Sequence, residues 1–170
     1  MRKIILQVAV SLDGFIEGPN GEIDWCFTDQ DYGMKDFFKQ IDTLFMGRKT
    51  YELMLSMGDD ATTGFPKLKQ YIFSTTLNEA EDGVVVDDVE SQVQKIRNEP
   101  GKDIWLFGGG NLTTSFMNLK LVDEVWLAVH PVLLGGGKPL FENIQARVSL
   151  KHLDTTTYSS GLVFLKYAIE

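Results

Sequence analysis

Hydrophobic positions along the chain change their spacing several times, and each change marks an expected element. Runs of β-branched and aromatic residues bounded by turn residues predict strands. These runs cover residues 4–10, 43–46, 70–74, 84–86, 104–107, 124–129, 147–156 and 162–169. Apolar residues spaced three and four apart predict helices instead. These stretches cover residues 31–41, 48–55, the segment from Asp87 to the break at Pro100-Gly101, and residues 111–119.

The order of these elements predicts the fold class. Strands alternate with helices over most of the chain, and the last two strands are joined through Ser159-Ser160-Gly161. Alternation favours parallel strands, whereas a short Gly-containing connection favours an antiparallel hairpin. We therefore expect a single α/β domain over residues 1–170, with three layers and a mixed, mostly parallel sheet that ends in an antiparallel C-terminal hairpin. Asp87-x-x-Glu90 fits a capping box at the start of the third helix.

Two glycine triplets interrupt the pattern, and they predict different roles. Gly108–Gly110 lies between a strand and a helix, where bare backbone and free N–H groups favour a phosphate. Gly135–Gly137 precedes no helix and predicts a structural turn. Neither triplet matches a standard nucleotide motif. Thr113 stands where a dinucleotide fingerprint has its third glycine, and Pro139 follows Lys138 where a P-loop has Ser or Thr.

Polar segments follow three of the predicted strands. They are Gly47-Arg48-Lys49-Thr50, Ser74-Thr75-Thr76 and Gly108-Gly109-Gly110-Asn111. Because carboxyl ends of parallel strands meet at one edge, we expect the three to share a ligand there. Arginine, lysine, hydroxyls and helix starts all suit phosphate, so the pattern predicts a ligand with more than one phosphate group. Taken singly, each segment also fits a structural role: a tight turn, a solvated helix cap and a Ser/Thr turn.

Composition and charge narrow the function classes. A net charge of −8 argues against a broad nucleic-acid-binding surface. No apolar stretch approaches the ~20 residues of a membrane span, and a single cysteine suits a reducing compartment, so we expect a cytoplasmic protein. That cysteine, Cys26, is interpreted as a buried or incidental thiol. One cysteine and two histidines give no zinc-deaminase signature, and no metal is expected.

Five segments together resemble the dihydrofolate reductase-like superfamily. They are SLDGFIEG near the start, MGRKTYE, FSTT, LFGGGNL and HPVLLGGGKPLF, and their order and spacing cover nearly the whole chain. In particular, the chain resembles stand-alone relatives of the reductase domain of the bifunctional riboflavin-biosynthesis deaminase/reductase. This resemblance implies a dihydrofolate reductase-like fold and NADPH-dependent hydride transfer.

The resemblance also implies which positions bind NADPH. Arg48, Ser74 and Thr75 match positions that hold the adenosine 2′-phosphate. Lys49 and Thr50 match the turn over one side of the pyrophosphate, with the glycine triplet on the other side. Two further positions match those flanking the nicotinamide. The full matching set is Ala9, Ile16, Gly47, Arg48, Lys49, Thr50, Ser74, Thr75, Gly108, Gly109, Gly110, Asn111 and Leu112.

The substrate expected from the resemblance is a small pyrimidine- or pterin-like ring. The activity would be like that of a 5-amino-6-(5-phosphoribosylamino)uracil reductase or a dihydrofolate reductase. We expect the ring between residues 12–30 and 45–54, with Trp25 beside it. Asp29, Asp31 and Asp36 are candidate carboxyl groups, although acids at a helix start are also common for structural reasons.

Asp59-Asp60 matches the sugar-phosphate stretch of the riboflavin reductases only in part. His130 and His152 are interpreted as structural residues. The alternatives are a non-catalytic nucleotide-binding module and a flavin-binding redox protein. Relatives pair through sheet edges, so we also expect a homodimer that covers the C-terminal hairpin.

Overall fold

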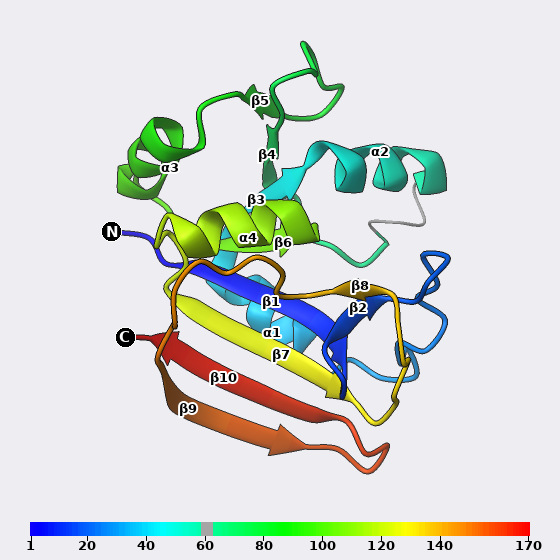
Figure 1. Cartoon of the computed structure of the whole chain (residues 1–170). Coiled ribbons are helices and arrows are strands. Elements are labelled where there is room, and N and C mark those ends of the chain that lie inside the picture. The colour runs from blue at the N-terminus through cyan, green and yellow to red at the C-terminus, as the bar shows by residue number, and fades with distance from the viewer. Residues whose placement is uncertain (59–62) are drawn as a thin grey trace.

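A mixed sheet of eight strands forms the middle layer of the molecule (Figure 1). The computed structural model describes residues 1–58 and 63–170. The strands are β1 (Ile4–Ser11), β3 (Ile41–Gly47), β4 (Lys69–Phe73), β5 (Val84–Val86), β6 (Asp103–Gly108), β7 (Glu124–His130), β9 (Leu150–Thr157) and β10 (Val163–Ile169). They lie in the order β5-β4-β3-β6-β1-β7-β10-β9. All neighbours pair in parallel up to β7, whereas β10 runs antiparallel to both β7 and β9, which confirms the predicted fold class.

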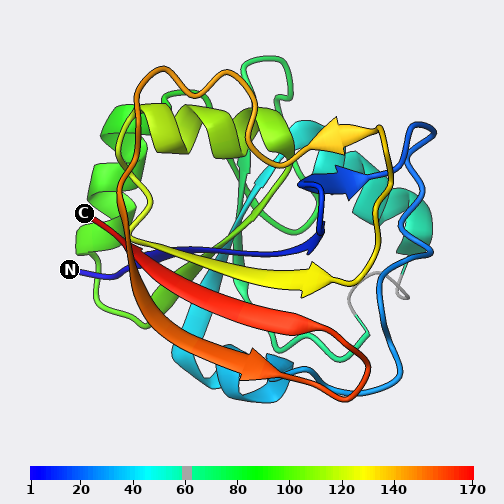
Figure 2. The same cartoon turned by 60° about the horizontal axis from the view of Figure 1, so that its bottom comes forward.

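Helices cover both faces of this sheet. They are α1 (Met34–Gln40), α2 (Arg48–Met57), α3 (Val89–Asn98) and α4 (Gly110–Asn118). Figure 2 shows α4 and α1 on opposite sides of the sheet. Successive side chains of a strand point to opposite faces, so Ile4 and Leu6 enter the core under α3 and α4, and Ile5 enters the core that contains α1. Burial on both faces explains why the central strands are apolar almost throughout.

Two helix starts differ from the sequence-based expectation. The first helix begins at Met34 instead of residue 31, because Gly33 precedes it in the left-handed region with φ 83°. The third helix is capped by Asp88, and the predicted capping box at Asp87 is wrong. The carboxylate of Asp88 accepts hydrogen bonds from the backbone N–H and the hydroxyl of Ser91. Asp87 is thereby left outside the helix, just after β5.

A small second sheet was not expected from the sequence. It pairs β2 (Phe15–Glu17) with β8 (Lys138–Pro139). Strands this short carry too few residues for an alternating pattern. Gly137 packs directly against this sheet, because a Cβ there would lie 2.1 Å from the carbonyl oxygen of Glu17.

Asp13 joins the turn at Gly135–Gly137 to the loop after β1 through hydrogen bonds. Its carboxylate accepts hydrogen bonds from the N–H groups of Leu134 and Gly135, at 3.1 and 2.8 Å, and from the hydroxyl of Ser11. The Ser11 hydroxyl is the main cause of a lowered Asp13 pKa, and the two N–H groups add to it. The turn at Gly135–Gly137 is thus structural, as predicted.

The C-terminal hairpin leaves β9 at the edge of the main sheet (Figure 1). All eight residues of β9 are exposed, among them Leu150 and Leu153. Pairing of two copies through this edge stays a prediction. In the described part of the chain, no helix combines the length and the apolar character needed to cross a membrane.

Candidate functional site

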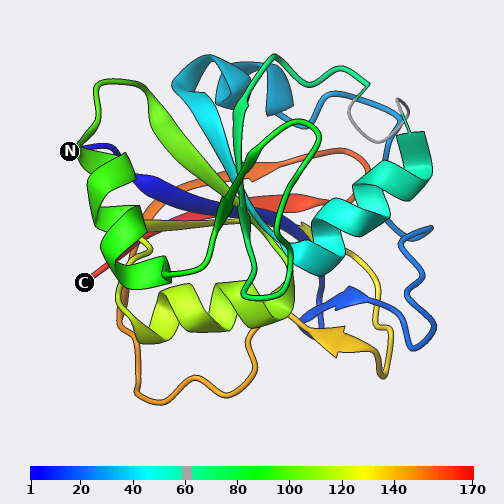
Figure 3. The same ribbon diagram turned by 90° about the horizontal axis from the view of Figure 1, so that it is seen from above.

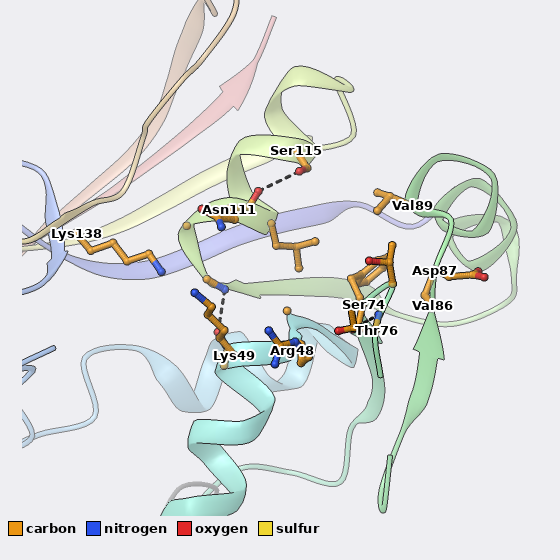
Figure 4. A pocket seen from close by; sticks show the side chains of 17 residues that line it. Arg48, Lys49, Ser74, Thr76, Val86, Asp87, Val89, Asn111, Ser115 and Lys138 are labelled. Carbon is orange, nitrogen blue, oxygen red and sulfur yellow. Dashed lines mark hydrogen bonds between the residues drawn. The ribbon is translucent and has the colours of Figure 1, made fainter. Parts of the chain in front are cut away.

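The carboxyl ends of four parallel strands and the starts of three helices surround a pocket of about 390 Å³ (Figure 4). We call it the first pocket. All three polar segments singled out in the sequence contribute to it, as expected from their positions after parallel strands. Its lining residues are Gly47, Arg48, Lys49, Thr50, Phe73, Ser74, Thr75, Thr76, Val86, Asp87, Val89, Gly109, Gly110, Asn111, Leu112, Ser115 and Lys138.

The starts of α2 and α4 lie close together (Figure 3), and residues of both line the first pocket. The N–H of Gly109 donates to Oγ1 of Thr50 at 3.0 Å, which joins the glycine triplet to the first turn of α2. Both helices have a glycine N-cap, Gly47 and Gly109, without a capping side chain. Their first N–H groups therefore lack a side-chain cap, and the positive ends of both helix dipoles lie at the same pocket.

The glycine triplet leaves little room for a side chain where it lines the pocket. A Cβ on Gly109 would lie 3.2 Å from Oγ1 of Thr50, and a Cβ on Gly110 would lie 3.0 Å from Cε of Lys138. Both contacts are tighter than ordinary van der Waals distances. Gly108 does not line the pocket; it turns the chain with φ 113°, which a side chain would strain.

Basic side chains give the first pocket a positive lining. Arg48 and Lys49 come from the start of α2, and Lys138 reaches toward them from β8 on the other side (Figure 4). Among the described lining residues, these three basic side chains face one acidic side chain, that of Asp87. The guanidinium of Arg48 pairs with the carboxylate of Glu52 one turn along α2, at 2.9 Å, and both side chains are a little under half exposed. Such an exposed pair is weak, so Arg48 remains available to a phosphate.

Ser74 takes part mainly in its own loop. Its Oγ accepts hydrogen bonds from the N–H groups of Thr76 and Leu77, at 3.1 and 2.9 Å. This is the Ser/Thr turn that the sequence offered as the structural interpretation of FSTT. Its hydroxyl proton can still be donated, and Thr75 beside it is exposed and lines the pocket.

A second pocket of about 480 Å³ opens on the α1 side of the sheet. Its lining residues are Gln7, Ala9, Cys26, Phe27, Thr28, Gln30, Asp31, Tyr32, Met34, Lys35, Phe38, Thr63, Gly64, Phe65, Ala128, His130 and Leu162. Ala9 and Ala128 are paired on neighbouring strands, so two small side chains form part of its wall. Of the residues expected to bind a cofactor, Ala9 lines this pocket, whereas Ile16 packs against the core on the opposite face.

His130 holds one wall of the second pocket. Its Nδ1 donates to the carbonyl oxygen of Ala128 at 2.9 Å, and its Nε2 accepts from the N–H of Phe27 at 3.1 Å. These partners require the neutral ring. Burial lowers the pKa of His130 below its ordinary value, although the backbone hydrogen bond of Ala128 opposes the shift. The structural role expected for His130 fits this arrangement.

The candidate acids lie in different surroundings. Asp31 lines the second pocket in the turn just before α1. Asp29 accepts a hydrogen bond from the hydroxyl of Tyr32 at 2.7 Å and does not line the pocket, and Asp36 pairs with Lys39 on an exposed helix face. Asp59 and Asp60 lie outside the described residues.

Other expected substrate contacts lie away from the second pocket. Trp25 packs edge-on against His130, with ring centroids 5.3 Å apart, and its ring N–H donates to the carbonyl oxygen of Glu22. It therefore lies behind the wall and does not line the pocket. The 45–54 region is also absent from the lining, and Phe45 itself is fully buried in the core on the other face of the sheet.

Cys26 contributes a thiol to the second pocket. Burial is the main cause that raises its pKa to about 11, and the negative charge of Asp24 adds to it. The side chain is therefore protonated at neutral pH and is a poor nucleophile.

Sequence reasoning missed two groups at these pockets. In the sequence, Lys138 stands out only as part of an incomplete P-loop motif, and Gln7 is one residue of an otherwise apolar strand. Gln7 did carry a signal, since a single amide in the run IILQVAV stands where a buried strand is otherwise apolar. Lys138 carried no such signal in the sequence, because the pairing of β8 with β2 is what brings it to the first pocket.

Comparison with known proteins gives these pockets a family context. The uncharacterized protein YyaP of Bacillus subtilis is 47% identical over 98% of this chain and 94% of its own length. Among solved structures, a putative riboflavin biosynthesis protein from Shewanella sp. PV-4 superposes with a TM-score of 0.87 at 25% identity, covering 100% of this chain and 99% of its own.

The dihydrofolate reductase of Enterococcus faecalis, solved with NADP(H), superposes with a TM-score of 0.68 at 16% identity, over 99% of this chain and 96% of its own. This likeness shows the dihydrofolate reductase-like fold. The family model of the RibD C-terminal domain matches residues 2–164. The chain therefore belongs to the RibD C-terminal domain family.

Proposed function

We propose that the protein is an NADPH-dependent reductase that acts on a small planar ring. The observation that carries this proposal is the first pocket: bare backbone at Gly109-Gly110, two helix starts and three basic side chains face one another there. This donor set suits a pyrophosphate with a further phosphate nearby. Family membership supports a reductase, and the similarly folded E. faecalis enzyme was solved with NADP(H).

The residues present fit a dinucleotide along the sheet edge. The glycine turn and the start of α2 would hold the pyrophosphate, with Lys138 adding charge from the side of the turn. Arg48 would fork onto the 2′-phosphate, and the exposed hydroxyl of Thr75 would donate beside it. This third phosphate is what makes NADPH a better match than NADH for a pocket with three cations.

The second pocket would receive the substrate. It opens at the carboxyl ends of β1 and β7, along the same sheet edge as the first pocket. NADPH supplies a hydride, and reduction of a C=N or C=O bond also consumes a proton. Asp31 is the acidic residue of the second-pocket lining, so it is the proposed proton source. The surrounding rings would orient the substrate and exclude water.

A matched pair of glycine variants tests the cofactor site. Gly110→Ala places a Cβ 3.0 Å from Cε of Lys138, whereas Gly136→Ala in the other triplet meets only Cγ of Pro19 at 3.9 Å. Calorimetric titration with NADPH should give heat of binding for the wild type and for Gly136→Ala, and weaker binding for Gly110→Ala. Absence of heat with the wild type, together with unchanged tryptophan fluorescence, would refute the proposal.

A non-catalytic nucleotide-binding module remains the second candidate. The observation that favours it is the exposure of Asp31, which leaves the proposed proton source open to solvent. NADPH oxidation that depends on an added pyrimidine or pterin would exclude this candidate. Asp31→Asn should then reduce the turnover rate, whereas Asp29→Asn should retain it.

A further inference from the structure

A buried amide faces the second pocket with little to bind. Gln7 is 8% exposed and lines the pocket. Its Nε2 lies 3.5 Å from Sδ of Met34, which is a weak acceptor. Among the described residues no hydrogen bond to Oε1 is found, and Oε1 is not one of the fully buried atoms without a partner, so it opens into the pocket. A ligand in the pocket can therefore pair with both ends of this amide.

The position of Gln7 is fixed by the sheet. It lies on β1 two residues before Ala9, so both side chains point to the same face. Its own carbonyl oxygen accepts a hydrogen bond from the ring N–H of Trp105 at 3.0 Å. The amide is therefore presented from a rigid central strand and not from a loop, which favours a role in selecting a ligand.

The rest of the pocket suits a flat ring. Ala9 and Ala128 leave space beside the amide because their side chains are small. Aromatic side chains surround that space: Phe27, Tyr32, Phe38 and Phe65. Aromatic side chains suit stacking against a planar heterocycle, and the single amide can then fix its orientation through the ring edge.

The charge of the second pocket differs from that of the first. Lys35 and Asp31 are the charged side chains of its lining, and they balance each other. His130 is held neutral by its two hydrogen bonds. The arginine and lysine cluster that suits phosphate lies in the first pocket instead. The second pocket thus lacks a phosphate clamp among the described residues, and the sequence of residues 59–62 adds no basic side chain.

We propose that Gln7 determines substrate specificity by pairing with an uncharged ring edge that has one donor beside one acceptor, as in a lactam. The substrate would be a planar heterocycle without a phosphate group. This inference rests on the proposed reductase function, because it assigns the ring to the second pocket of that enzyme. It narrows the pyrimidine- or pterin-like class to rings that a carboxamide can pair with through two hydrogen bonds.

A change from amide to carboxylate tests the pairing. Gln7→Glu replaces a donor and an acceptor with two acceptors, so it should favour a ring edge with two donors. We would compare 5,6-diaminouracil with 2,4-diaminopyrimidine at mildly acidic pH, where the latter carries a proton. The ratio of their affinities should shift at least about tenfold toward the diaminopyrimidine, since one buried hydrogen bond is exchanged for another. Gln7→Met should weaken 5,6-diaminouracil about tenfold.

The control carries the same substitution away from the pocket. Gln40 is exposed on α1 and does not line the second pocket, so Gln40→Glu should leave the affinity ratio within about twofold of the wild type. Uridine and uridine monophosphate test the claim that the substrate has no phosphate group. If the claim holds, the nucleotide should bind no more tightly than the nucleoside. Thermal unfolding of each variant checks that Gln7→Glu is folded.

Each outcome bears on one claim. An unchanged ratio in folded Gln7→Glu, or no binding of either ring to the wild type, would overturn the role of Gln7. Tenfold tighter binding of uridine monophosphate would overturn the phosphate-free substrate. NADPH binding is measured separately on the same samples. Ring binding without NADPH binding would remove the reductase proposal and leave the role of Gln7 supported.

Discussion

Arg48 is the side chain whose removal should distinguish NADPH from NADH. It lies at the first position of α2 and lines the first pocket. If it binds the 2′-phosphate, Arg48→Ala should weaken NADPH and leave NADH almost unchanged, because only NADPH carries that group. The other basic residues, Lys49 and Lys138, would bind the pyrophosphate that both cofactors share.

The expected size of the effect follows from the contacts of Arg48. A hydrogen bond to a charged group contributes about 1.5–3 kcal/mol. To make it, the guanidinium gives up part of its exposed pair with Glu52, at 2.9 Å, and such a pair contributes about 0.3–0.5 kcal/mol. The difference of about 1–2.7 kcal/mol corresponds to roughly a 5- to 100-fold weaker dissociation constant for NADPH. Glu52→Gln should have the opposite effect and tighten NADPH about twofold.

Calorimetric titration of each variant with both cofactors measures these changes directly. Arg147→Ala is the matched control, because it removes an exposed positive charge that does not line the first pocket. A long-range charge effect would weaken NADPH similarly in both arginine variants. If Arg48→Ala weakens NADPH and NADH equally, Arg48 does not bind the 2′-phosphate.

Two further predictions concern stability. His130 is held neutral in the folded state with a lowered pKa, so the unfolded chain takes up the proton first as the pH falls below about 6.5. The free energy of unfolding should therefore decline below that pH, and urea titrations at high and low pH should show a smaller decline in His130→Phe. Gly137→Ala should lower the unfolding free energy by more than about 1 kcal/mol, because its Cβ would meet the backbone of Glu17 at 2.1 Å and its φ is 129°. A Gly137→Ala protein as stable as Gly136→Ala would contradict this packing.

The centre of the main sheet could be predicted from the sequence because its strands are long and apolar on both faces. The β1 run IILQVAV and the β7 run EVWLAVH each cross the core in full. By contrast, β2 and β8 are only a few residues long, and their pairing depends on how the chain returns to the sheet. No local pattern encodes that return, so Lys138 could not be placed at the first pocket.

The two pockets differ in how far the sequence predicted them. The meeting of the three polar segments at the first pocket could be predicted because strand ends of a parallel sheet share one edge, whatever the details of the loops. The lining of the second pocket could not be predicted in the same way. Residues 45–54 were expected beside the ring, yet none of them lines this pocket, and the side chain of Phe45 points to the opposite face of the sheet. Trp25 likewise supports the wall from behind instead of lining it.

A crystal structure of the protein grown with NADP⁺ would test the central claim most directly. The claim predicts a pyrophosphate between Gly109-Gly110 and the start of α2, the 2′-phosphate at Arg48, and the nicotinamide directed toward Ala9 and the second pocket. Density for the dinucleotide elsewhere, or a first pocket that stays empty at saturating NADP⁺, would contradict the account.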